Sequence, residues 1–326
     1  MEVLITGITG FVGSHLADYI LDNFSGVRVS GLARWRSPVG NIRHIANKIT
    51  LQYGDLVDLP SLTAILSKER PDVIFHLAAQ SYVPYSFSAP VATLTANVIG
   101  TCNLLEAVKE LKFNDDYNPV IHICSSSEVY GQVKEDEVPI TESVPLRPAS
   151  PYAVSKVAED RLAFQYWLSW QIRTITTRMF THTGPRRGEV FVVSNFAKQI
   201  AAIEAEVAPP VVKVGNLDSV RTFLDVRDAV KAYWQLVNKC PPGEVYNIGG
   251  VETMTVGQML DRLLKLSRVK NIRIELDRER LRPSDVTLQI PCIDKFTAAT
   301  GWKPEIKFDK TLQDTLDYWR EFYMRS

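Results

Sequence analysis

The sequence predicts an α/β protein: a Rossmann-type, doubly wound parallel sheet with a smaller, discontinuous mixed α/β substrate domain. Short apolar runs alternate with helical patterns through the first half of the chain. A glycine-rich turn, 6–13, follows the first apolar run, and a hydroxyl-rich segment, 124–131, follows a later one. Strands that alternate with helices form parallel sheets, and ligands bind at the carboxyl ends of such strands.

The glycine-rich turn connects the apolar run 3–5 to a helical pattern over 14–21. Glycines let a backbone approach a phosphate closely, and the N-terminus of a helix offers free amides and a positive dipole. The spacing Gly-x-x-Gly-x-x-Gly between a strand and a helix predicts dinucleotide binding, although glycines also serve plain tight turns. The predicted cofactor contacts here are Gly7, Gly10, Phe11, Val12 and Gly13.

The second apolar run, 27–32, ends without the acidic residue that would hold the ribose 2′-hydroxyl of NAD. Arg34 and Arg36 follow it, and guanidinium groups suit a 2′-phosphate. NADP is therefore the predicted cofactor, with a pair of solvated arginines as the alternative. A third run ends in Asp55 and Leu56, which are expected near the adenine.

A fourth run, 72–80, ends in the small residues Ala78 and Ala79 after Leu77, which leaves room for a cofactor against the backbone. His76, within this run, is expected to be a packed core histidine. A helix from about Ala92 to Leu111, with Asn97 on it, is predicted to follow.

Two stretches supply acid and base groups. Tyr152 and Lys156 are four residues apart and so lie on one face of a helix, where an ammonium is expected to lower the pKa of the phenol. Ser126 and Glu128, two residues apart at the end of an apolar run, are expected to face the same way. The four side chains are predicted to converge, although Tyr-x-x-x-Lys alone also occurs by chance on amphipathic helices.

Composition excludes several classes of partner. With 326 residues, 45% of them hydrophobic and 23% charged, the chain is expected to form one large or two moderate globular domains. The 37 basic and 37 acidic residues give no general reason to bind nucleic acid or membrane. Four scattered cysteines without histidines at ligand spacing predict a reduced, cytoplasmic protein without a structural metal. No signal peptide is expected, and no apolar run suggests a membrane span.

Taken together, the motifs resemble the extended short-chain dehydrogenase/reductase superfamily over nearly the whole chain. They are Thr6-Gly7-x-x-Gly10-x-x-Gly13, His76-Leu77-Ala78-Ala79, Ser125-Ser126-Ser127-Glu128-x-Tyr130-Gly131 and Tyr152-x-x-x-Lys156. The segments 185–192 and 215–221 look like the GDP-mannose 4,6-dehydratase branch. A comparably close likeness, through 196–200, 225–228 and 282–284, is to the GDP-6-deoxy-4-keto-mannose reductases.

The resemblance implies NADP-mediated conversion of GDP-mannose to GDP-4-keto-6-deoxymannose. A GDP-4-keto-6-deoxymannose reductase, another nucleotide-sugar dehydratase or epimerase, or a cofactor-sensing protein without activity remain alternatives. Ser126, Glu128, Tyr152 and Lys156 are the expected catalytic residues, and Glu128 separates elimination from plain reduction. Tyr152, Lys156, His182 and Arg187 are expected at the cofactor, Arg187 at that of a neighbouring subunit. The implied substrate contacts are Ser81, Ser86, Ser126, Glu128, Thr181, Val190, Asn195, Lys198, Gly215, Arg221, Arg282 and Asp285.

The expected domains are an NADP-binding Rossmann domain over 1–180, to which 222–250 returns, and a mainly nucleotide-sugar-binding domain over 181–326. The resemblance also implies a homodimer or homotetramer. Three departures from the dehydratase branch are visible: Phe11-Val12 replaces Gln-Asp, Ser126 replaces Thr, and Thr181 replaces Asn.

Overall fold

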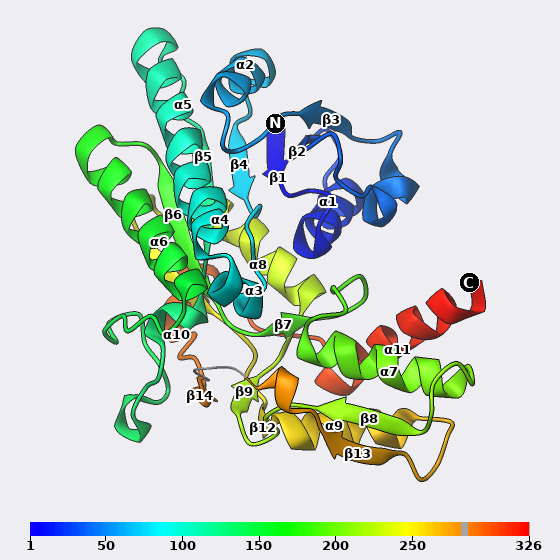
Figure 1. Cartoon of the computed structure of the whole chain (residues 1–326). Coiled ribbons are helices and arrows are strands. Elements are labelled where there is room, and N and C mark those ends of the chain that lie inside the picture. Colours follow the sequence, from blue (N-terminus) through cyan, green and yellow to red (C-terminus); the bar gives the residue numbers. More distant parts are fainter. Residues whose placement is uncertain (282–285, 326) are drawn as a thin grey trace.

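A seven-stranded, fully parallel sheet forms the centre of the larger lobe (Figure 1), with the strand order β11-β6-β5-β4-β1-β2-β3. The computed structural model describes residues 1–281 and 286–325. The strands are β1 (Glu2–Thr6), β2 (Arg28–Ala33), β3 (Thr50–Tyr53), β4 (Val73–His76), β5 (Val120–Ser126), β6 (Thr174–Met179) and β11 (Val245–Ile248). The predicted Rossmann-type sheet is confirmed.

Helices cover both faces of this sheet. On one face lie α1 (Phe11–Asn23), α8 (Val226–Lys239) and α10 (Asp294–Thr300); on the other lie α2 (Leu59–Glu69), α5 (Gly100–Asp115) and α6 (Pro151–Trp170). Strand β4 is buried at every residue, as expected for a parallel strand between two helical layers. The apolar runs in the sequence reflect this double burial.

One long helical stretch runs from 90 to 115, and so exceeds the predicted bounds at both ends. It consists of α4 (Pro90–Leu94), a π-helical turn η2 (Thr95–Ile99) and α5, after the short α3 (Val83–Ser88). By length and composition alone this stretch could cross a membrane, which the sequence analysis did not anticipate; 44% of its apolar window is buried inside the protein. Here it packs against α2 and α6 as a core helix.

Helix α6 begins where the sequence indicates. Ser150 is its N-cap, with the hydroxyl accepting from the Ala153 amide at 3.1 Å, and Pro151 occupies the first turn, where its missing N–H costs nothing. The segment between β5 and α6 holds the 3-10 turns η3 (Ser127–Tyr130) and η4 (Glu135–Glu137). This start of α6 sets which side chains face the end of β5.

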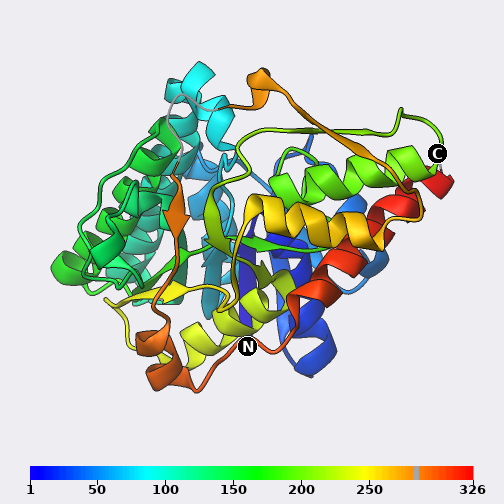
Figure 2. The ribbon, with the colours of Figure 1, turned by 90° about the horizontal axis from the view of Figure 1, so that it is seen from below.

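The smaller lobe has its own apolar core around Phe196, Met259 and Leu312. Helices α7 (Val192–Glu204), α9 (Val256–Leu266) and α11 (Phe308–Arg325) pack together there (Figure 2). Its small sheets pair β8 (Val211–Val214) with β13 (Arg273–Leu276), and β9 (Val220–Thr222) with β12 (Thr253–Thr255) and β14 (Leu288–Gln289). The remaining elements are η1 (Gly40–Ile45), η5 (Arg278–Arg280) and the paired strands β7 (His182–Thr183) and β10 (Leu224–Asp225).

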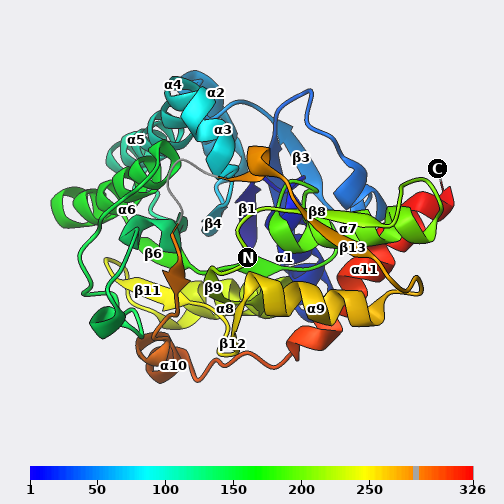
Figure 3. The same cartoon turned by 60° about the horizontal axis from the view of Figure 1, so that its bottom comes forward.

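The chain crosses between the lobes several times. After β6 it builds α7, β8 and β9, then returns with α8 and β11, which pairs with β6 at the edge of the large sheet. Figure 3 brings the smaller lobe forward, with α7, α9 and α11 together on the right of the view. The two lobes are therefore interleaved in sequence, and the space between them is lined from many separate segments.

Candidate active site

A cavity of about 2280 Å³ lies at the carboxyl ends of the central strands, beneath the smaller lobe. Residues that follow β1, β4 and β5 line one side of it, and residues of α7, β8 and η5 line the other. A pocket for one drug-sized ligand has roughly 300–1,000 Å³. This cavity is therefore large enough for two extended ligands lying end to end.

The glycine-rich turn forms one end of the cavity. Gly7 has φ of 72°, its carbonyl accepts from the Gly10 amide at 2.9 Å, and a Cβ at Gly13 would lie 2.3 Å from that same carbonyl oxygen. No side chain caps the N-terminus of α1, so its first amides remain available. Glycines at these positions and open helical amides fit the diphosphate of a dinucleotide. Gly7, Gly10, Phe11, Val12 and Gly13 all line the cavity.

The side chains of the two arginines after β2 lie in different places relative to the cavity. Arg34 lines the cavity, whereas the guanidinium of Arg36 lies over the ring of Trp35, 4.5 Å from its centroid, and outside the cavity lining. A turn in which the Ser37 amide donates to the Arg34 carbonyl separates the two side chains. The expectation that both arginines face the cofactor is therefore wrong for Arg36. Asp55, Leu56, Leu77, Ala78 and Ala79 line the cavity as expected.

His76 is a core residue, as predicted. Its ring is 2% exposed, lies between the hydroxyls of Thr6 and Thr101 at 2.9 Å each, and burial lowers its pKa to about 3. The Thr6 hydroxyl also accepts from the amides of Leu77 and Ala78, both at 3.1 Å. This histidine therefore fixes the ends of β1 and β4 and takes no proton from a ligand.

Ser126, Glu128, Tyr152 and Lys156 all line the cavity. Ser126 ends β5, and its hydroxyl accepts from the Glu128 amide at 3.2 Å and forms a hydrogen bond with the Tyr152 hydroxyl. Tyr152 and Lys156 come from the first two turns of α6 and are 8% and 4% exposed. The structure thus brings Ser126 and Tyr152 into contact, with Lys156 on the same helix and the backbone of Glu128 next to Ser126.

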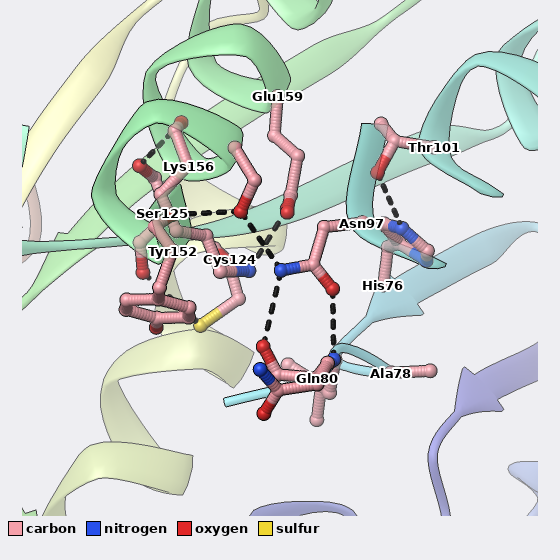
Figure 4. Close-up of polar contacts among 12 residues, drawn as sticks. His76, Ala78, Gln80, Asn97, Thr101, Cys124, Ser125, Tyr152, Lys156 and Glu159 are labelled. Carbon is pink, nitrogen blue, oxygen red and sulfur yellow. Dashed lines mark hydrogen bonds and ion pairs between the residues drawn. The ribbon is translucent and has the colours of Figure 1, made fainter. Parts of the chain in front are cut away.

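The electrostatics of Tyr152 differ from expectation. Burial raises its pKa above the usual value of a phenol, and the Lys156 ammonium and the Ser126 hydroxyl offset this only in part. Lys156 Nζ lies 6.0 Å from the Tyr152 ring centroid and donates instead to Glu159 Oε2 and to the Cys124 carbonyl, both at 2.9 Å (Figure 4). Lys156 lowers the pKa of Tyr152 as expected, but burial of the phenol outweighs this contribution, and the Glu159 carboxylate adds a smaller rise.

Asn97 holds the cavity wall behind these residues (Figure 4). Its amide oxygen accepts from the Gln80 amide at 2.7 Å, and its amide nitrogen donates to the Gln80 carbonyl at 3.1 Å and to the Ser155 hydroxyl at 2.8 Å. This side chain ties the end of β4 to α6. The sequence placed Asn97 on a helix but gave no signal for these contacts, which depend on the π-helical turn.

The segment after β6 adds aromatic and cationic side chains to the wall of the cavity. The His182 ring stacks on Phe11 with centroids 5.8 Å apart, and the Arg187 guanidinium lies 4.9 Å from the Phe11 centroid and 3.5 Å from that of Phe191. Burial lowers the pKa of His182 to about 3 and that of Arg187 to about 10. Arg187 lines the cavity of its own chain, and its expected reach to the cofactor of a neighbouring subunit stays a prediction.

The smaller lobe supplies the other end of the cavity. Thr181, Val190, Asn195, Lys198, Gly215 and Arg221 line it, and Ser81, after β4, lines the cavity from the larger lobe, all as expected for substrate contacts. Ser86 does not: it is 0% exposed and donates its hydroxyl to the Val83 carbonyl at 2.6 Å inside α3, so its predicted role is wrong. Arg282 and Asp285 lie outside the described residues.

A further cation at this end was missed in the sequence. Arg280 lines the cavity and donates from Nη1 to Asn195 Oδ1 at 2.8 Å, and Lys198 forms an ion pair with Glu189. No local pattern marks Arg280, because only the tertiary fold brings η5 next to α7. Across residues 1–281 and 286–325, no group of three or more side chains has the composition of a metal site.

Comparisons with known proteins agree with this geometry. A family model described as GDP-mannose 4,6 dehydratase matches residues 4–315. The chain is 34% identical to the GDP-6-deoxy-D-mannose reductase of Pseudomonas aeruginosa (98% of this chain, 97% of that protein) and 31% identical to a GDP-mannose 4,6-dehydratase of Vibrio cholerae (95% and 91%).

Solved structures are similar over nearly the full length. RMD from Pseudomonas aeruginosa, complexed with NADPH, superposes with a TM-score of 0.84 at 32% identity, covering 98% of this chain and 99% of that one. The UDP-glucose 4-epimerase of Thermus thermophilus, in complex with NAD, gives 0.85 at 27% identity with the same coverage. The match to the family model spans both lobes and every residue of the catalytic group. The chain therefore belongs to the GDP-mannose 4,6-dehydratase family.

Proposed function

We propose that the protein is a GDP-mannose 4,6-dehydratase that uses NADP and forms GDP-4-keto-6-deoxymannose. The observation that carries the proposal is the position of Glu128. Glu128 lines the cavity and its backbone amide donates to the Ser126 hydroxyl, which supports its use as a second acid/base group for a sugar bound there. The matching family and the Vibrio cholerae relative support the same reaction.

The glycine-rich turn and Arg34 would hold NADP, and its nicotinamide ring, when bound, supplies hydride acceptance and return. Tyr152 takes the proton of the sugar C4 hydroxyl, while Ser126 hydrogen-bonds the same oxygen. Lys156 holds its ammonium group near Tyr152 by donating to the Glu159 carboxylate and to the Cys124 carbonyl of β5. Together these side chains position the C4 oxygen for its conversion to a carbonyl.

The C4 ketone acidifies the hydrogen on C5. Glu128 takes this C5 proton as a general base and gives it to the C6 hydroxyl, which leaves as water. The hydride removed from C4 then goes to C6, and the proton removed from the C4 hydroxyl goes to C5. The net reaction removes one water from the sugar and leaves the cofactor in its starting oxidation state. At the far end, Lys198, Arg221 and Arg280 place cations along the cavity, where the diphosphate of a GDP-sugar would bind.

One observation favours a second function, the NADPH-dependent reduction of GDP-4-keto-6-deoxymannose. A ketone reductase needs a proton donor beside the substrate oxygen, and the Tyr152 phenol, hydrogen-bonded to Ser126, can serve as that donor. The Pseudomonas aeruginosa relative carries the name of such a reductase. A plain reduction uses Ser126, Tyr152 and Lys156 and gives Glu128 no chemical step.

A single assay distinguishes the dehydratase from the reductase. The protein is incubated with GDP-mannose and catalytic NADP⁺, and the 4-keto product is followed by mass spectrometry together with NADPH absorbance. Product without net NADPH supports the dehydratase. Turnover of GDP-4-keto-6-deoxymannose with one NADPH consumed per product supports the reductase, and NADP binding without either reaction supports a sensor.

Glu128→Gln tests the assigned role directly. The variant is expected to block water loss while hydride still leaves C4, because Tyr152 and Ser126 remain in place. Deuterium at C4 of GDP-mannose reports that step by its appearance on the cofactor. Glu137→Gln, at a partly buried carboxylate that pairs with Arg147 outside the cavity lining, is the control and keeps full activity. Unchanged dehydration by Glu128→Gln would exclude the proposed step.

We further propose a cytoplasmic homodimer or homotetramer. The outer faces of α5 and α6 expose Phe113, Phe164 and Leu168 at 66%, 47% and 64%, which fits a self-association surface. All four cysteines are free thiols, as expected in a reducing compartment. Sedimentation velocity tests the assembly: Phe164→Glu with Leu168→Glu is expected to give monomers, and an unchanged sedimentation coefficient rejects this surface.

A further inference from the structure

Glu159 is a buried carboxylate one turn beyond Lys156 on α6 (Figure 4). The residue is 1% exposed, its Oε2 lies 2.9 Å from Lys156 Nζ, and its Oε1 has no hydrogen-bond partner among the described residues. Burial of a carboxylate is costly unless an opposite charge compensates for it. The lysine of the catalytic group is that compensating charge.

The other charged groups near this pair are accounted for. On α6, Asp160 is paired with Arg178 of β6 at 2.8 Å. His122 of β5 and His76 of β4 are neutral because burial lowers the pKa of each to about 3, and the Cys124 thiol of β5 has a raised pKa. Burial raises the pKa of Glu159 itself to about 7, so above this pH Glu159 is the anion that pairs with the Lys156 ammonium, with the Tyr152 phenol as the remaining ionisable neighbour.

A free ammonium at Lys156 would favour the ionised form of Tyr152. The Glu159 carboxylate, 2.9 Å from Nζ, acts on the phenol in the opposite sense and offsets part of this support, although the effect of the ammonium remains the larger of the two. The carboxylate also holds Nζ by a second bond in addition to the Cys124 carbonyl, at 2.9 Å, and so limits where the ammonium can move.

We propose that Glu159 is a positioning residue of the reaction: its carboxylate anchors the Lys156 ammonium beneath the cavity and opposes loss of the proton from Tyr152. The proposal rests on the proposed function only in that Tyr152 exchanges a proton with the sugar. Glu159 acts on the reaction through Lys156 and does not itself touch the substrate. By its effect on the phenol, Glu159 favours the step in which Tyr152 donates a proton over the step in which it accepts one.

The first test needs no substrate. Glu159→Gln keeps the length of the side chain and an oxygen for Nζ but removes the negative charge. Tyrosinate absorbance is titrated in the full-length protein, and the Tyr152 signal is isolated by subtracting the titration of Tyr152→Phe made in the same background. The half-point of this signal is expected to move by about one pH unit or more toward acid, because one charge has been removed from the coupled Tyr152–Lys156 pair.

The second test uses turnover. The pH profile of hydride transfer, measured with whichever substrate the protein accepts, is expected to move toward acid by the same amount in Glu159→Gln, with KM unchanged. Glu159→Asp keeps the charge at a greater distance from Nζ and is expected to give an intermediate profile. Asp317→Asn removes a carboxylate from another i,i+3 ion pair, with Arg320 on α11, and is expected to leave both titrations unchanged.

Two results would overturn the proposal. One is a Tyr152 titration in Glu159→Gln that coincides with that of the wild type. The other is a loss of rate without any displacement of the pH profile, which a purely structural carboxylate would produce. If Glu159→Gln does not fold, Glu159→Asp decides the question, since a profile identical to the wild type then excludes control by this charge. Absence of turnover with all nucleotide sugars would reject the proposed function and leave the absorbance titration as an independent answer.

Discussion

Arg178 on β6 and Asp160 on α6 form an ion pair that is almost completely buried, with Nε 2.8 Å from Oδ2. The same guanidinium donates to the Tyr130 hydroxyl at 3.0 Å and to the Glu142 carbonyl at 2.8 Å. It thus connects a central strand, the helix that carries Tyr152, and the segment between them. The orientation of α6 against the sheet depends on this contact.

Asp160→Asn is therefore expected to destabilise the protein by about 3 kcal/mol, because it leaves a buried guanidinium without its counter-charge. Urea unfolding monitored by circular dichroism measures the change. Asp317→Asn, which breaks a pair whose carboxylate is 48% exposed, is the matched control and should cost less than about 1 kcal/mol. Equal effects of the two substitutions would contradict the structural role of the Arg178 contact.

Gly13→Ala is expected to weaken NADPH binding at least about tenfold, equivalent to about 1.4 kcal/mol. The added Cβ would lie 2.3 Å from the Gly7 carbonyl oxygen, so the turn must open and its amides must move. Fluorescence titration with NADPH measures the dissociation constant. Gly40→Ala serves as control, since no atom lies within 4 Å of its added Cβ. Unaltered binding by Gly13→Ala would mean that the turn does not hold the cofactor.

Arg34→Ala is expected to reduce the preference for NADPH over NADH by roughly 10- to 100-fold, the value of about 1.5–3 kcal/mol for hydrogen bonds to a charged group. Arg36→Ala should change it little, because its guanidinium rests on Trp35 outside the cavity. The ratio of the two dissociation constants is the measurement. A larger loss in Arg36→Ala than in Arg34→Ala would reverse the assignment.

The free energy of unfolding is expected to fall as the pH drops below about 6.5. Burial lowers the pKa of His15 to about 4 and those of His76, His122 and His182 to about 3, so below pH 6.5 the unfolded chain binds protons that the folded chain does not. Each histidine contributes a slope of up to about 1.4 kcal/mol per pH unit between its two pKa values.

His15→Gln should remove one such contribution between pH 6.5 and pH 4 and so flatten the dependence. Urea unfolding at a series of pH values measures it. His44→Gln, at a side chain that is 50% exposed, is the control and should leave the slope as it is. An unchanged slope in His15→Gln would show that this ring is already protonated in the folded protein.

Local patterns in the sequence were sufficient for the fold and for much of the site. The glycine-rich turn and the Tyr152–Lys156 spacing are short-range features, since a turn needs its glycines and a helix places i and i+4 on one face. Ser126 and Glu128 were found because the end of an apolar strand marks the edge of a parallel sheet. The family resemblance supplied the residues of the smaller lobe.

What the sequence did not predict depends on which way a side chain turns and on what lies against it. Glu159 stands at helical spacing from Lys156, yet only the packing of α6 on the sheet buries it. Arg280 reaches Asn195 through the tertiary fold alone. Ser86 and Arg36 were misassigned for the same reason, because one faces the interior of α3 and the other rests on Trp35.

The pairing of β11 with β6 has a consequence for biosynthesis. Residues 245–248 complete the large sheet, but they are made after α7, β8 and β9 of the smaller lobe. Until they leave the ribosome, β6 presents an unpaired edge to the cell, and such an edge readily pairs with another chain. The larger lobe cannot finish folding before α7, β8 and β9 of the smaller lobe have been translated, so the two are expected to be inseparable by proteolysis or by dissection of the gene.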